Sequence, residues 1–183
     1  MITTFRVSDA LRCMLVGAPG GANQAAPTES VVRCRPLRNS TFWKQSIARD
    51  THRVTVGDWK GMDLSSLASA RMRSGSRAWE VDRLYLPEQK PEKAIDLLEQ
   101  VVQCAGSRGA ERVFLRVSSD SPIADAARKI GFYAYYEEQH LTGQDWKADP
   151  SDEPISRYSV ESPTQDDFHG LFQLYCASTP QQV

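Results

Sequence analysis

The stretch WEVDRLYLPEQKPEKAIDLLEQVVQCAGSRGAERV, from Trp79 to Val113, decides the fold. It begins as a strand, passes through a polar loop that contains Pro91, and continues with apolar residues at helical spacing from Ala94 to Ala105. The residues ERVFLRVS that follow, 111–118, are nearly continuously apolar and predict a strand buried on both faces. Because a helix that joins two adjacent strands makes a right-handed parallel crossover, the stretch predicts an α/β fold.

The residues on either side of this stretch predict an antiparallel beginning and a helical end. Before it we expect a strand over 2–9, a helix over 8–17, a loop over 18–30, a helix over 37–50, and paired strands over 52–59 and 64–73. After it we expect a short helix that Asp120 or Ser121 caps and Gly131 ends, then a closing strand over 132–141. The predicted sheet is therefore mixed, antiparallel first and parallel in the middle.

The composition describes an ordinary globular protein. The chain has 183 residues, 40% of them hydrophobic and 25% charged, with a net charge of -1. A nucleic-acid-binding protein would carry a strong basic excess, so this class is disfavoured. The local basic run Arg71, Arg73 and Arg77 is read as a solvated hairpin turn.

The cysteines and the hydropathy pattern bear on location and on metals. Cys13, Cys34, Cys104 and Cys176 are far apart in the sequence and lack histidines at ligand spacing, so we expect no metal site. Scattered single cysteines indicate a reducing, cytoplasmic environment. The sequence contains no apolar run of the length that a membrane span requires, and its beginning does not resemble a secretory signal.

The composition changes near Asp145. Asp, Pro and Ser residues over 145–156 predict a linker, which leaves one domain over 1–144. Residues 157–183 then predict a strand, a loop and a helix with Phe168, Leu171, Phe172 and Tyr175 on its apolar face. This order weakly repeats the start of the chain, so we interpret the segment as the beginning of a second copy or as a docking tail.

The segment VFLRVSSDSPIADAARKIGF, 113–132, resembles the end of the GNAT acetyltransferase superfamily, which reads roughly V-x-L-x-V-x-x-x-N-x-x-A-x-x-L-Y-x-K-x-G-F. The matching residues are Val113, Leu115, Val117, Lys129, Gly131 and Phe132. Together with the order of elements, the resemblance covers roughly residues 2–143. It implies a GNAT-like mixed, partly antiparallel sheet with helices on both faces.

The resemblance also implies a chemistry. In the family, acetyl-CoA enters between two splayed central strands, and a Q/R-x-x-G-x-G/A loop turns its amide groups toward the pyrophosphate. The helix N-terminus behind the loop favours phosphate. A carboxylate on the central strand deprotonates an amine acceptor, and a tyrosine commonly reprotonates the thiolate.

The loop positions of this sequence match that pattern only in part. Gln89 takes the first position and Ala94 the last, but Glu92 stands where glycine is expected, and Pro91 has no N–H to donate. A carboxylate near a phosphate is unfavourable by about 1 to 4 kcal/mol. Lys90 and Lys93 would compensate in part. The remaining cofactor-binding candidate, Asp120, stands at the family's asparagine position, and Ala127 replaces its tyrosine.

The candidates for the catalytic base are Glu80 and Asp82, which strand alternation places on one face, opposite Trp79 and Val81. The alternative interpretation is the polar face of a half-exposed strand. We therefore expect either of two functions. The first is a degenerate GNAT domain, a non-catalytic partner of a second GNAT domain or of a second copy. The second is an acyl-CoA-dependent N-acyltransferase for an unidentified amine.

Overall fold

A computed structural model describes residues 2–16, 21–33, 35, 37, 51–73, 77–87, 90–140 and 161–178. The chain divides into two compact units, Met1–Tyr133 and Ala134–Val183. The helix predicted after Leu37 and the linker predicted over 145–156 lie outside the described residues, as does the candidate Gln89.

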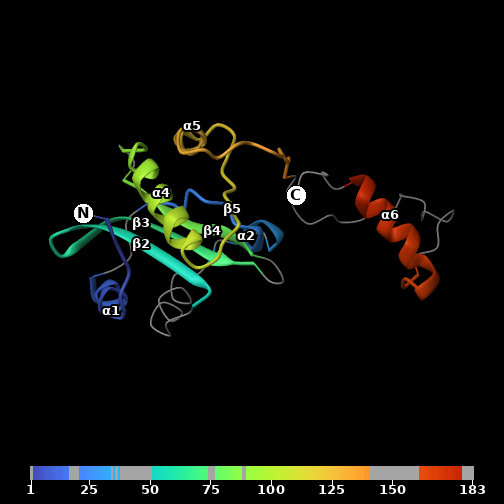
Figure 1. Cartoon of the computed structure of the whole chain (residues 1–183), viewed down its shortest axis with the longest axis horizontal. Coiled ribbons are helices and arrows are strands. Elements are labelled where there is room, and N and C mark those ends of the chain that lie inside the picture. Colours follow the sequence, from blue (N-terminus) through green and yellow to red (C-terminus); the bar gives the residue numbers. More distant parts are fainter. Residues whose placement is uncertain are drawn as a thin grey trace, which may run out of the picture. The chain divides into compact units, whose positions relative to one another are not determined.

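Within the described part of the first unit, the sheet has five strands in the order β1-β2-β3-β4-β5 (Figure 1). The strands are β1 (Ile2–Thr4), β2 (Arg53–Lys60), β3 (Asp63–Met72), β4 (Ala78–Tyr85) and β5 (Arg112–Phe114). Neighbouring strands are antiparallel except for the parallel pair of β4 and β5. The predicted mixed sheet and its parallel crossover are confirmed.

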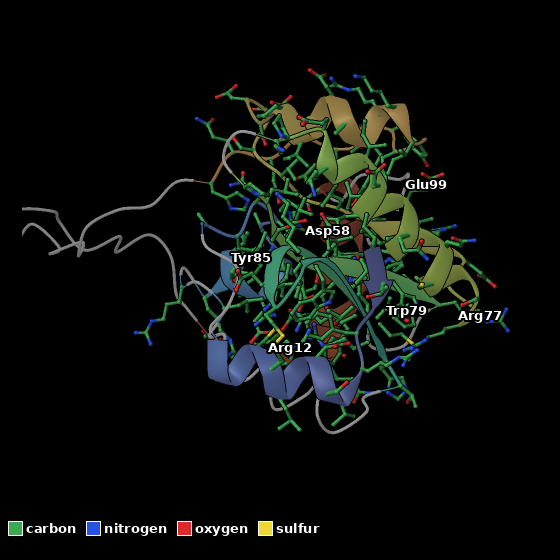
Figure 2. The ribbon with its side chains drawn as sticks, turned by 90° about the vertical axis from the view of Figure 1, so that its left-hand side faces the viewer. Arg12, Asp58, Arg77, Trp79, Tyr85 and Glu99 are labelled. Atoms are coloured by element: carbon green, nitrogen blue, oxygen red, sulfur yellow. The ribbon has the colours of Figure 1, made fainter. Side chains whose placement is uncertain are left out.

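Helices cover both faces of this sheet. On one face, α4 (Lys93–Gly106) packs on β1, β2 and β3, and its stripe of Leu97, Leu98 and Val101 is fully buried in the main core. On the other face, Cys13 of α1 (Val7–Val16) packs with Leu67 and Tyr85 in a second core cluster. Figure 2 shows Arg12 of α1 and Glu99 of α4 on opposite sides of the sheet.

The central strand β4 contains a bulge. Ser69 of β3 pairs with Arg83, but Ala70 pairs with Val81, so Asp82 is the extra residue in β4. A bulge bends its strand and changes the direction of the side chains around it. Trp79 and Val81 belong to the main core, while Glu80 and Asp82 contact polar groups on the other face.

Three local predictions need correction. The predicted loop over 18–30 contains the start of the helix α2 (Thr28–Val32). The strand predicted over 111–118 is short, and β5 is only half-buried on its apolar positions. The closing strand over 132–141 is wrong, because Phe132–His140 form no strand and Tyr133 and Tyr136 are exposed. Pairing with a sheet edge, which sequence periodicity cannot show, decides such strands.

The remaining helices lie near the C-terminal ends of the two units. In the first, α5 (Pro122–Lys129) begins where the Ser121 hydroxyl accepts from the Ile123 amide, and it packs on α4. In the second, the short 3-10 helix η1 (Gln165–Asp167) leads into α6 (Phe168–Ser178), which confirms the predicted helix; the start of the segment, where a strand is predicted, lies outside the described residues. Thr164 and Asp167 form a capping box at this start.

Candidate functional site

The first candidate base, Glu80, is buried on β4 and already accepts hydrogen bonds. The Thr28 amide and hydroxyl donate to its Oε1 at 2.8 Å and 2.6 Å. The guanidinium of Arg71 lies 3.5 Å from its Oε2. The carboxylate thus holds the N-terminus of α2 on the sheet, and both of its oxygens have partners.

The second candidate, Asp82, is completely buried and contacts two arginines. Arg53 donates to its Oδ1 at 2.9 Å and to its Oδ2 at 2.8 Å, and Arg83 donates to Oδ2 at 2.9 Å. Burial lowers the pKa of the Arg83 guanidinium, and the Asp82 charge opposes this effect. The bulge in β4 makes the cluster possible by placing Asp82 and Arg83 next to each other on one face.

A cavity of about 450 Å³ lies beside Glu80. Its lining carries both acidic and basic side chains, which come from α2, from the end of β3 and from β4. The lining residues are Thr28, Glu29, Val32, Arg33, Arg71, Met72, Arg73 and Glu80. Arg71 also donates to Glu29 at 2.8 Å, and this hydrogen bond holds the pKa of Glu29 below its usual value against the opposing effect of burial. The carboxylates in the lining are therefore neutralised by arginine.

The N-terminus of α4 is the place where the resemblance puts a phosphate loop. Here four backbone amides of the described residues already have acceptors within the chain. The amides of Lys90, Lys93, Ala94 and Ile95 donate to the carbonyls of the residues three positions earlier, at 3.0, 3.2, 3.0 and 3.1 Å. Pro91 has no amide hydrogen, and the exposed Glu92 has helical backbone angles and makes no capping bond with its side chain.

The lysines of this loop differ in their surroundings. The Lys93 ammonium forms a salt bridge with Asp58 of β2, although both residues lie far apart in the sequence. Burial alone would raise the pKa of Asp58, but Lys93 is the foremost of the groups that lower it, to about 2. Lys90 is exposed. Lys93 is therefore a structural cation that ties α4 to the sheet.

The other residues carried over from the resemblance lie in different settings. Ala94 is fully buried in the core, so its small side chain is explained by packing. Ala127 is also buried in the core, at the position of the family's tyrosine. Asp120 is exposed in the turn before α5. The structure thus brings Glu80 and Asp82 together on β4 and places Lys93 and Ala94 at the start of α4.

Sequence reasoning missed one part of the site. The segment Asn23–Ala26, within the predicted loop, bridges β4 and the chain after β5. The Gln24 amide donates to the Leu84 carbonyl at 2.8 Å, and the Ala26 amide donates to the Arg116 carbonyl at 2.9 Å. Ala25 is buried in the structure, but a single alanine in a stretch that otherwise reads as a loop gives no sequence signal of that burial.

Comparison with known proteins identifies this architecture. Neither a protein-family model nor a curated protein sequence matches the chain. Among solved structures, glucosamine-6-phosphate N-acetyltransferase from Arabidopsis thaliana aligns with a TM-score of 0.52 at 12% identity, over 79% of this chain and 98% of its own. AAC(6')-Iy, solved with the bisubstrate analogue CoA-S-monomethyl-acetylneamine, aligns with a TM-score of 0.53 at 11% identity, over 79% and 98%.

A third neighbour agrees with these two. An aminoglycoside acetyltransferase from an uncultured soil metagenomic sample, solved with sisomicin, aligns with a TM-score of 0.52 at 12% identity, over 79% of this chain and 95% of its own. None of the helices in the described parts of the chain has the length and apolarity that a membrane span requires. At these identities the likeness concerns architecture, and it is consistent across the neighbours. The chain adopts the fold of the GNAT acetyltransferases.

Proposed function

We propose that this chain is a non-catalytic GNAT-fold domain that supports a second GNAT domain. The observation that carries the proposal is the N-terminus of α4. The amides of Lys90, Lys93, Ala94 and Ile95 donate to carbonyls of their own loop, and Pro91 has none to donate. A helix N-terminus binds phosphate through amides that are not otherwise used. The loop is built to close on itself and offers a pyrophosphate few donors.

The charges around this loop support the same conclusion. Glu92 is exposed at the start of α4, and Asp96 follows it in the first turn of the helix. The Lys93 ammonium that would balance them is held by Asp58. A pyrophosphate approaching this helix would meet two carboxylates and, from the described residues, the exposed lysine Lys90.

The two candidates for the catalytic base, Glu80 and Asp82, also support a structural role for this domain. A general base needs a lone pair within reach of the acceptor amine. Each oxygen of Glu80 faces Thr28 or Arg71, and each oxygen of Asp82 faces a guanidinium. Both carboxylates therefore serve to connect the strands and α2, which suits a domain that has the fold without the chemistry.

The supporting role follows from α6. Its apolar residues Phe168, Leu171, Phe172, Leu174 and Tyr175 are all exposed in the second unit. An isolated helix of this length is marginal in water, so it needs a packing partner. The sequence of 157–183 weakly repeats the start of the chain, so we propose that a second GNAT-like domain supplies this partner.

The alternative, an acyl-CoA-dependent N-acyltransferase, has two observations in its favour. The cavity beside Glu80 is large enough for part of an acceptor molecule, and AAC(6')-Iy has been solved with a CoA-containing analogue. In this alternative Gln89, Lys90, Lys93 and Ala94 would hold acetyl-CoA. The alternative requires the Lys93–Asp58 pair to open or to tolerate the phosphates.

The experiment that tests the proposal compares two single-charge variants of α4. We expect Glu92→Gln to strengthen the binding of inorganic pyrophosphate in a thermal-shift titration, because it removes a carboxylate from the helix start. Glu99→Gln, which removes the same charge from an exposed position further along α4, is the matched control and should not strengthen this binding. Tight binding by the wild-type protein, weakened by Glu92→Gln, would refute the account of the loop.

A further inference from the structure

Beyond the residues that pair with β5, the edge of β4 is hydrogen-bonded to another segment of the chain. β4 and β5 pair only over Ala78–Glu80 and Arg112–Phe114. Further along β4, the Leu84 amide donates to Asn23 Oδ1 at 2.8 Å, and the Leu84 carbonyl accepts from the Gln24 amide at 2.8 Å. Both backbone groups of Leu84 are thus satisfied by the segment Asn23–Ala26: the carbonyl by a backbone amide, as in a neighbouring strand, and the amide by the Asn23 side chain.

The same segment reaches the opposite side of the gap. The Ala26 amide donates to the Arg116 carbonyl at 2.9 Å, and the Arg116 guanidinium returns a bond to the Thr28 hydroxyl at 3.1 Å. Asn23 Nδ2 adds a bond to the Asp82 carbonyl at 2.9 Å. The segment therefore connects β4 with the chain after β5.

Packing and anchoring fix the segment on both sides. The side chain of Ala25 is buried in the main core with Leu84 and Leu86. Before the segment, Gly21 has a φ of 100°, where an L side chain is disfavoured. After it, Thr28 is held by Glu80. The segment is therefore anchored to the core through Ala25, while the Gln24 side chain stays exposed.

We propose that the gap between β4 and the chain after β5 is a binding site for an extended polypeptide backbone, and that this chain fills it with its own Asn23–Ala26 segment. The site recognises main-chain donors and acceptors, as sheet edges do. A pantetheine arm, which presents two amide groups in an extended chain, would need the same Leu84 amide and carbonyl. It can enter only if the segment leaves.

This inference does not depend on the phosphate loop of α4. Pantetheine lacks the pyrophosphate of CoA, so it probes the gap between the strands without touching the charges near Glu92. A failure of the proposed function, such as catalysis by the intact protein, and a failure of this inference therefore appear in different measurements.

The test follows amide hydrogen exchange of Leu84 by NMR in the full chain. In the wild type we expect the Leu84 amide to be protected. In Asn23→Ala we expect it to exchange roughly tenfold faster, because the acceptor is removed. Gln24→Ala is the matched control, since its side chain is exposed and the backbone donor remains; Leu84 exchange should not change.

A second arm uses pantetheine itself. We expect millimolar pantetheine to leave the Leu84 amide resonance of the wild type in place. A wild-type Leu84 amide that exchanges as fast as the exposed turn at Gly61 would overturn the inference. Unchanged exchange in a folded Asn23→Ala variant, or a saturable pantetheine shift at wild-type Leu84, would overturn it as well. The wild-type measurements decide even if Asn23→Ala does not fold.

Discussion

Replacing Lys93 by methionine tests whether this lysine belongs to the fold or to a cofactor site. The Lys93 side chain is 23% exposed and that of Asp58 is 8% exposed, so their salt bridge is largely shielded from water. The pKa of Asp58 falls from its ordinary 3.8 to about 2, against the effect of burial and with Lys93 first among the lowering groups.

The expected magnitude follows from that pKa. At about 1.4 kcal/mol per pKa unit, the ionised Asp58 stabilises the folded state by about 2 kcal/mol at neutral pH. Lys93→Met should therefore lower the free energy of unfolding by about 1 to 2 kcal/mol at pH 7. Because the folded pKa is lowered, this stabilisation is present above about pH 4 and is lost as the pH falls toward 2.

The assay is urea unfolding followed by tryptophan fluorescence between pH 7 and pH 2.5. The matched control is Lys90→Met, at an exposed position on the same loop, which should change the free energy by less than about 0.5 kcal/mol. The reasoning is refuted if the two variants are equally stable at pH 7. A Lys93→Met deficit that is unchanged at pH 2.5 would also contradict it.

Three further predictions concern the buried carboxylate, the cysteines and α6. Asp82→Asn should lower the free energy of unfolding in urea by about 3 to 5 kcal/mol, since it breaks a buried ion pair; a loss below about 1 kcal/mol would count against the cluster. Burial, and to a lesser extent the charge of Asp9, raises the pKa of Cys13 to about 11. Iodoacetamide at pH 8 should therefore modify the exposed Cys176 and spare Cys13 in the native protein. Equal modification of the two cysteines, measured by mass spectrometry, would contradict this prediction. Light scattering should find the same mass for the wild type and Phe172→Glu, because α6 is proposed to pack on a different domain; a dimer that the substitution dissociates would indicate a second copy as the partner.

The parts of the fold that local pattern determines were predictable. The stripe of α4 and the alternation in β2 gave these elements their type and their buried faces. The resemblance at 113–132 added the topology. The strand predicted over 132–141 failed because its aromatic residues, which favour strands, say nothing about whether a sheet edge is available.

The candidate site was predictable only as a set of positions. The sequence indicated that Glu80 and Asp82 share a face and that Glu92 interrupts the loop pattern. It could not show that Thr28 and Arg71 bind the Glu80 carboxylate, or that Asp58 forms a salt bridge with Lys93, because these partners are distant along the chain. The segment Asn23–Ala26 was missed for the same reason: its hydrogen bonds depend on the tertiary fold.

The most direct test of the central claim is a calorimetric titration of the wild-type protein with acetyl-CoA. Four amides at the start of α4 are already bonded, Glu92 is exposed there, and Asn23–Ala26 fills the gap beside β4. We therefore predict no saturable heat up to about 1 mM acetyl-CoA, a limit that corresponds to a binding free energy weaker than about -4 kcal/mol. A dissociation constant in the low micromolar range would contradict the account.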